Sequence, residues 1–152
     1  MNRSVFVRSG VVIALASAML GGCSMMRSAT GGGSEAFEAR LSGSEEVPPK
    51  TTSGSGTAEV RYNRGTGMLH YRVVYSGMTG PVTAGHIHGP AAPGANAGVM
   101  VPFATNVGNS PFEGEVSITP EQLASIEAGQ TYVNLHTAAN PGGEIRGQLR
   151  RR

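Results

Sequence analysis

The stretch that decides the fold runs from Thr57 to Tyr75 and has the sequence TAEVRYNRGTGMLHYRVVY. Its second half alternates, so that one face of an extended chain carries Leu69, Tyr71, Val73 and Tyr75. Such alternation is typical of a half-buried strand. The preceding segment, residues 57–62, predicts another strand, and the NRGTG between the two supplies the glycines of a short turn. The stretch therefore predicts a β-hairpin.

Outward from the hairpin, the chain predicts more short strands and one helix. Further strands are expected at residues 37–41, 82–88, 99–103, 112–118, 131–137 and 144–149. The helix begins after Thr119, with threonine as the N-cap, Pro120 at the first helical position and Gln122 three residues after the cap. About seven or eight strands with one short helix indicate an all-β fold, a Greek-key sandwich or barrel.

The N-terminus has the pattern of an export signal. Arg3 and Arg8 precede an apolar run over residues 10–19, which is shorter than the about 20 residues of a transmembrane helix and fits a signal peptide. Leu20-Gly21-Gly22-Cys23 follows and resembles the lipobox of bacterial lipoproteins. In that family the cysteine thiol receives a diacylglyceryl group, and cleavage makes the cysteine the new N-terminus. An ordinary secretory signal with an incidental cysteine is the alternative.

These features divide the chain into three parts. Residues 1–22 are the expected signal peptide, residues 23–35 the lipidated Cys23 with a glycine-rich tether, and residues 36–150 one folded domain. The expected location is the cell envelope, with the membrane contacted through the lipid on Cys23. In an organism with two membranes this means the periplasmic face or the outer membrane.

The composition excludes several kinds of function. Cys23 is the only cysteine, so no disulfide within the chain and no multi-thiolate zinc site can form. All ten acidic residues are glutamates, which rules out aspartate-based triads and aspartyl-phosphate chemistry. Without residues 1–22, ten basic residues balance ten acidic ones. No basic face appears, so the sequence does not favour nucleic acid as a partner.

Three histidines stand in a setting that suits metal binding. His86 and His88 are two residues apart in an expected strand, so both side chains point to one face. Two imidazoles at this spacing can converge on one copper or zinc ion. His136 lies near the end of another expected strand, and both strands lead into loops rich in glycine and proline. Free histidine titrates near pH 6.5, so binding is expected to weaken towards pH 5.

The sequence resembles the CHRD domain, a chordin-type module of extracellular animal proteins and bacterial envelope proteins. The matching segments are LSGSEEVPP (41–49), GTGMLHYRVVYSGM (65–78), AGHIHGPAAPGANAGVMVPF (84–103) and TPEQLASIEAGQTYVNLHTAANPGGEIRGQL (119–149). The resemblance implies an exported all-β sandwich, and it implies little about chemistry.

A more distant resemblance concerns the histidines. His-x-His on a strand with a later strand histidine is similar to Cu/Zn superoxide dismutase, a Greek-key fold in which such residues help bind copper. Carried over, His86 and His88 match the pair and His136 the later ligand. The bridging histidine has no counterpart, an aspartate zinc ligand is impossible without aspartate, and Arg146 is a weak match for an active-site arginine. The resemblance therefore implies at most a mononuclear site.

Three functions follow as hypotheses. The first is a lipid-tethered module that binds a metal ion or another ligand without catalysis. The second is a copper redox enzyme using the three histidines, and the third is a structural or adhesive module whose histidines only anchor loops. Glu144 and Arg146 form a weaker, secondary candidate site, because on a strand they share a face. A surface ion pair is the plainer interpretation of these two residues, and such a pair contributes little to stability. Glu45 and Glu46 are expected in a solvated loop.

The lipid anchor is directly testable. Replacing Cys23 with alanine removes the acylated thiol, so the protein is expected to leave the detergent phase when cells expressing the variant are fractionated. If the Cys23→Ala protein stays in the detergent phase like the parent, the lipoprotein interpretation is wrong.

Overall fold

A computed structural model describes residues 33–104 and 106–152. The expected signal peptide, Cys23 and most of the expected tether lie outside these residues. The described residues contain no helix with the length and apolar character needed to cross a membrane.

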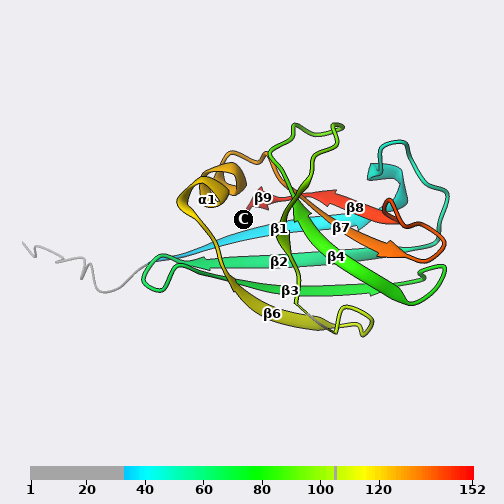
Figure 1. Ribbon diagram of the computed structural model, residues 1–152, viewed down its shortest axis with the longest axis horizontal. Helices are drawn as coiled ribbons and strands as arrows, with labels where there is room; N and C mark the ends of the chain where they lie inside the picture. Colours follow the sequence, from blue (N-terminus) through cyan, green and yellow to red (C-terminus); the bar gives the residue numbers. More distant parts are fainter. Residues whose placement is uncertain (1–32, 105) are drawn as a thin grey trace, which may run out of the picture. The chain divides into compact units, whose positions relative to one another are not determined.

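The domain is all-β, as the sequence predicts, with one short helix (Figure 1). The strands are β1 (Ser34–Ser42), β2 (Ser55–Asn63), β3 (Met68–Ser76), β4 (Val82–His88), β5 (Val99–Pro102), β6 (Phe112–Ser117), β7 (Tyr132–Thr137), β8 (Ile145–Gln148) and β9 (Arg150–Arg151). The helices are α1 (Pro120–Glu127) and a single 3₁₀ turn, η1 (Gly43–Glu45). The expected helix and its capping box are confirmed, because the Thr119 hydroxyl accepts from the Gln122 amide and the Gln122 side chain accepts from the Thr119 amide.

The strands form one antiparallel sheet that curls into a half-barrel, in the order β5-β4-β7-β8-β1-β2-β3-β6. The hairpin of β2 and β3 pairs without a break from Ser55↔Ser76 to Asn63↔Met68. β3 and β4 are consecutive in the chain but far apart in the sheet order, which is the kind of connection that a Greek key requires. The short β9, which the sequence did not predict, pairs with Phe37 and Glu38 in the middle of β1.

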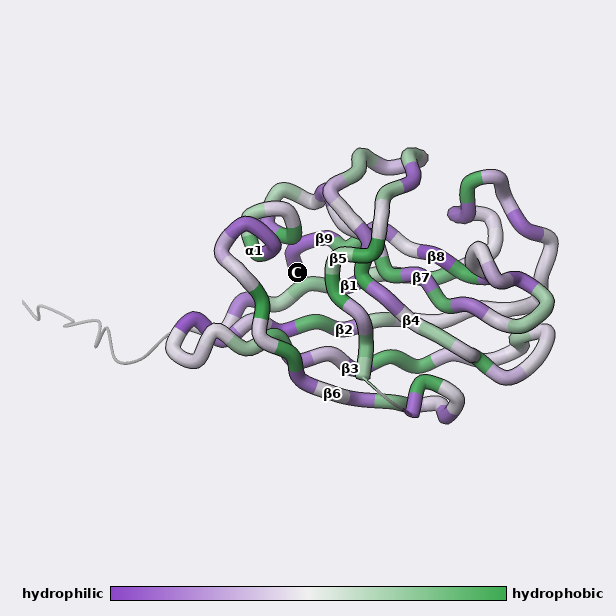
Figure 2. Tube along the Cα trace, in the orientation of Figure 1, coloured by the Kyte–Doolittle hydropathy of each residue, from purple (hydrophilic) through white to green (hydrophobic). Residues whose placement is uncertain are grey.

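The core lies on the concave face of the curled sheet. Alternate residues of each strand point inward, and α1 adds Leu123 and Ile126. Figure 2 shows this alternation as green and purple bands along the strands. The inward residues of the strands include Phe37, Leu41, Val60, Leu69, Val73, Ile87, Val133, Leu135 and Ile145, all at most 2% exposed. The domain thus holds together by apolar packing, without a disulfide.

β7 departs from the usual strand pattern, because all six of its residues are buried. Val133 and Leu135 face the core, while Tyr132, Asn134 and His136 face the opposite side. Two loops cover that polar face, residues 43–54 and residues 89–98. The loops meet where the Asn96 side-chain amide donates to the Val47 carbonyl at 2.9 Å. Polar side chains are therefore buried on both β7 and β8.

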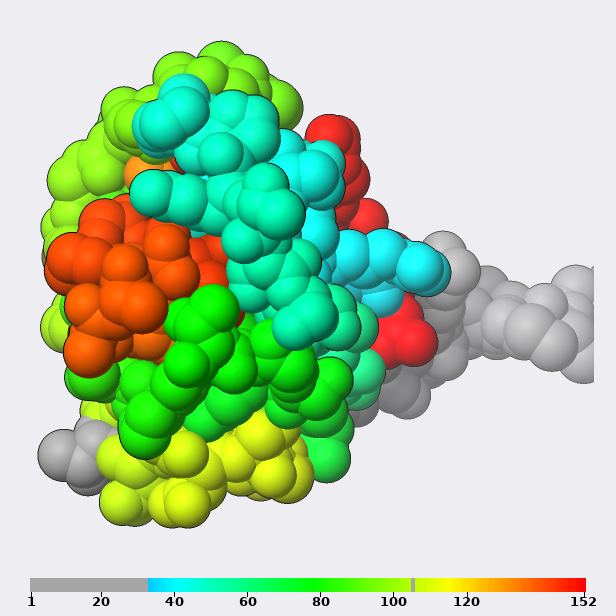
Figure 3. Space-filling view, turned by 90° about the vertical axis from the view of Figure 1, so that its right-hand side faces the viewer, coloured from blue at the N-terminus to red at the C-terminus, as the bar shows by residue number. Residues whose placement is uncertain are grey.

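One end of the domain is built around the carboxylate of Glu144, which is fully buried. Three loops meet there, residues 43–54, 77–81 and 138–143, and Figure 3 views the domain from this end. The carboxylate accepts hydrogen bonds from the hydroxyls of Thr52 at 2.8 Å, Thr79 at 2.6 Å and Thr137 at 2.6 Å. Burial raises the pKa of Glu144, but these hydrogen bonds outweigh it and lower the pKa from 4.5 to about 2.

Glu144 is therefore expected to make the domain sensitive to acid. Its folded-state pKa lies below the unfolded value, so its stabilisation is complete above about pH 4.5 and is lost as pH falls towards 2. The shift corresponds to on the order of 3 kcal/mol. Glu144→Gln should lower the free energy of unfolding in urea at neutral pH by a similar amount, and its difference from the parent should shrink as pH falls. The exposed Glu113→Gln is the control and should change stability little. A difference for Glu144→Gln that does not depend on pH would contradict this role.

Candidate metal centre

The three histidines that the sequence singled out lie together on the outer, polar face of β4 and β7. In the register of the two strands, His136 pairs with Ala84, and His86 pairs with Asn134. Directly paired residues of antiparallel strands share a face, so His86, His88 and His136 point to the same side. Ile87, between the first two histidines, is fully buried in the core on the other side.

The rings are close enough to share one ion. One nitrogen from each of the three residues lies within 4.8 Å of the others. His86 Nδ1 and His136 Nε2 are 3.1 Å apart. Nitrogens bound to a single copper or zinc ion at about 2.0–2.1 Å would themselves be about 3.3 Å apart in a tetrahedral site. The pair of His86 and His136 already has about this spacing, and no pair must contract by more than about 1.5 Å.

Backbone carbonyls determine which nitrogen is available on two of the rings. His88 Nδ1 lies 3.0 Å from the carbonyl oxygen of Ala97, and His136 Nδ1 lies 3.0 Å from that of Pro141. A carbonyl oxygen only accepts, so in both neutral rings Nδ1 carries the proton and Nε2 carries the lone pair. Histidines that bind metals usually donate their second N–H to such a carbonyl. Loop anchoring and metal binding therefore use different nitrogens and are compatible.

His88 Nε2 is a buried nitrogen without a hydrogen-bond partner. An unmatched lone pair in this position costs free energy, and most buried polar atoms have a partner. His136 Nε2 differs, since it accepts the proton that His86 Nδ1 carries. A metal ion bound by His86 Nδ1 and the two Nε2 atoms would replace that proton and satisfy His88.

The three rings are held in the neutral form that a metal requires. Burial, helped by the neighbouring rings of His136 and His88, lowers the pKa of His86 to about 4. Burial also lowers the pKa of His88 and the pKa of His136. The expected loss of binding towards pH 5 is therefore shifted to lower pH, because each ring is harder to protonate than free histidine.

The side chains of His88, Tyr132 and Arg146 form a stack. The Tyr132 ring lies parallel to the His88 ring, with centroids 5.0 Å apart and planes inclined by 5°. The Arg146 guanidinium lies over the Tyr132 ring, 3.5 Å from its centroid, as a cation–π contact. Arg146 also donates to the Asn96 side chain and the Ala95 carbonyl, at 2.9 and 2.7 Å. It thereby fixes the loop whose Ala97 carbonyl holds His88.

The expectations for Glu144 and Arg146 need correction. Both side chains are buried, at 0% and 2% exposure, and each has its own partners, so they do not form a surface pair. Glu144 belongs to the threonine cluster at the end of the domain, and Arg146 belongs to the stack behind His88. The sequence places them two residues apart but says nothing of the loops that fold over them.

The expectation that Glu46 lies in a solvated loop is also wrong, because its side chain is buried. It is 6% exposed, and the Asn134 side-chain amide donates to its carboxylate at 2.5 Å. Gly143, with φ of 127°, passes so close that a Cβ there would lie 2.5 Å from Asn134 Oδ1. The sequence held no signal for this contact, since the partners are 88 residues apart.

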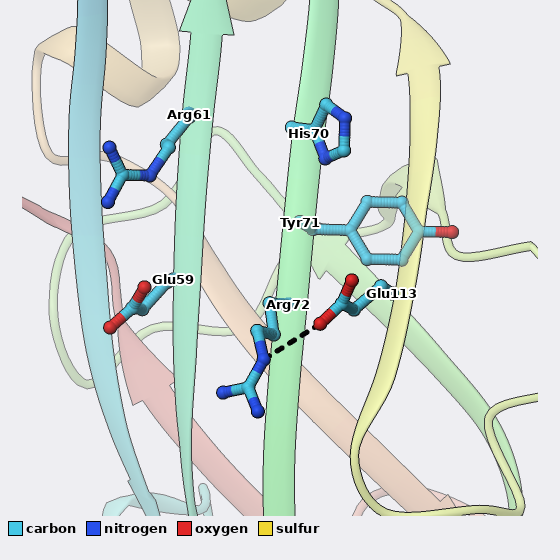
Figure 4. Close-up of a pocket in the computed structure, with 6 residues that line it drawn as sticks. All are labelled: Glu59, Arg61, His70, Tyr71, Arg72 and Glu113. Carbon is cyan, nitrogen blue, oxygen red and sulfur yellow. Dashed lines mark hydrogen bonds and ion pairs between the residues drawn. The ribbon is translucent and has the colours of Figure 1, made fainter.

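His70, the fourth histidine, lies outside the cluster. It sits on β3, with its side chain 59% exposed and its Nε2 2.8 Å from Glu115. Figure 4 shows the shallow hollow beside it, lined by side chains of alternating charge, with Arg72 and Glu113 paired at 2.8 Å. Exposed pairs of this kind contribute little free energy. His70 thus serves as a matched control for the three clustered histidines.

Comparison with known proteins identifies the family. The family model of the CHRD domain matches residues 37–149, nearly all of the described domain. Neither the curated proteins nor the solved structures contain a match. The resemblance to Cu/Zn superoxide dismutase therefore stays a hypothesis.

Proposed function

We propose that this chain, which belongs to the CHRD domain family, is a metal-binding module of the cell envelope that holds one copper or zinc ion through His86, His88 and His136. Catalysis is not part of the proposal. The signal-peptide pattern and the lipobox-like LGGC ending at Cys23 support export and lipid anchoring.

The observation that carries the proposal is the buried, unpartnered His88 Nε2 beside two other histidines. A loop-anchoring role explains why Nδ1 of His88 and of His136 meet carbonyls. It explains neither the unpartnered nitrogen nor His86, which makes no hydrogen bond to a loop carbonyl and whose ring nitrogen meets that of His136. A metal ion accounts for all three residues at once.

The three proposed ligands differ in exposure. His88 and His136 are 8% exposed, whereas His86 is half-buried. Three protein ligands leave a further coordination position for water or another small ligand, as in catalytic zinc sites. This open position is the feature that keeps a redox enzyme as the second candidate.

The binding site is testable by isothermal titration of the untagged full chain with Cu(II) and Zn(II) at neutral pH. One ion per chain is expected, with Cu(II) bound more tightly than Zn(II). His86→Ala is the most informative variant, because it removes a ligand and leaves both loop-anchoring bonds intact. The metal affinity should fall by more than about 10–100-fold, which is the usual loss when a residue hydrogen-bonded to a metal ligand is removed.

His70→Ala is the control and should bind both metals like the parent, since its ring is exposed on β3. Circular dichroism and thermal unfolding check that each variant is folded. The proposal fails if neither metal binds the parent below millimolar concentration, or if His70→Ala costs as much affinity as His86→Ala. In that case loop anchoring is the role of the histidines.

A further inference from the structure

The segments that carry the three histidines have no charged residues. The sequence contains none from Ser76 to Phe112 and none from Ala128 to Gly143. These two segments include β4, β5, β7 and the loops that follow β4 and β7. Across the described ranges, 33–104 and 106–152, the only residues grouped closely enough to hold an ion are the three histidines, without a carboxylate among them.

The charged groups packed around this face do not bond to the histidines. Arg146 is cationic, lies over the Tyr132 ring, and lowers the pKa of His88 less than burial and the His136 ring do. The Glu46 carboxylate accepts a hydrogen bond from the Asn134 side-chain amide and makes none with a histidine. Glu144 is bonded to Thr137, whose side chain points away from the face of His136.

The charge of the ion therefore affects how strongly this site can bind it. Three neutral imidazoles leave the full charge of a bound ion uncompensated in a partly buried site. The cost of burying charge grows with its square, so a doubly charged ion is penalised about four times as strongly as a singly charged one. Cu(I) carries one charge, whereas Cu(II) and Zn(II) carry two.

Coordination geometry favours the same ion. Cu(II) prefers square-planar or tetragonal surroundings of nitrogen and oxygen ligands. Here the three nitrogens come from one face of two neighbouring strands, and two of the rings are fixed by Ala97 and Pro141. Three fixed ligands leave at least one position of a tetragonal set to be filled by water or another small ligand. A three-coordinate ion needs no such completion.

We propose that the cluster of His86, His88 and His136 holds copper as Cu(I) in preference to Cu(II) and Zn(II). The inference rests on the proposed metal site and specifies its occupant. The module is then a carrier or store of reduced copper in the cell envelope, and Arg146 and the charge-free loops select the oxidation state.

The test compares affinities in the untagged full chain. Cu(I) is titrated without oxygen against bicinchoninate, and Cu(II) and Zn(II) are titrated by competition with chelators of known affinity. The Cu(I) dissociation constant is expected to be at least about tenfold below that of Cu(II), and each tenfold preference raises the reduction potential by about 59 mV. His86→Ala must abolish the preference, whereas Cys23→Ala, which removes the only thiol, must leave it unchanged.

A charge variant makes the cause testable. Ala84 lies on the same face as His136 and His86, so Ala84→Glu places a carboxylate beside the ion, and Ala84→Gln is the uncharged control. Ala84→Glu should lower the potential of the bound copper by about 59 mV or more, whereas Ala84→Gln should leave it near that of the parent. The inference is overturned if the parent binds Cu(II) or Zn(II) as tightly as Cu(I), or if the two variants behave alike. Failure of the parent to bind any of the three ions overturns the proposed site itself.

Discussion

The burial of β7 on both faces is the constraint on which the rest of the structure depends. A strand that buries polar side chains must give each of them a partner, because an unmatched donor or acceptor costs about 1–3 kcal/mol. For β7 and its neighbours β4 and β8, the partners come from loops, some near and some far away in the sequence. Glu46 meets Asn134, Asn96 meets Arg146, and the carbonyls of Ala97 and Pro141 meet two histidines.

This requirement explains why the covering loops have defined positions although they are rich in glycine, alanine and proline. Hydrogen bonds to Arg146, Tyr132 and His88 position the loop of residues 89–98. In the loop of residues 43–54, Glu46 bonds to Asn134 and Thr52 bonds to Glu144. The same contacts fix the imidazole rings before any ion is bound. A site arranged in advance loses little conformational entropy on binding. His88 Nε2 and the Thr131 hydroxyl are buried without a hydrogen-bond partner, and the proposed ion would give His88 Nε2 one.

The sequence predicted what depends on local periodicity. Alternation of apolar residues located the β2–β3 hairpin, the capping pattern located α1, and the two-residue spacing of His86 and His88 placed both on one face. The position of His136 near the end of its strand also indicated that it could lie beside His86 and His88. The sequence could not predict contacts that depend on how the sheet curls. Glu46, Arg146 and Glu144 therefore looked like surface charges, although loops that join distant strands bury all three.

The central claim is that one ion sits between three imidazoles on the outer face of β4 and β7. Anomalous diffraction at the copper absorption edge, from crystals of the copper-loaded protein, tests it most directly. The account predicts a single anomalous peak within bonding distance of His86 Nδ1, His88 Nε2 and His136 Nε2, with the Ala97 and Pro141 hydrogen bonds retained. A peak elsewhere, or copper bound by His70 with the three rings unchanged, would contradict it.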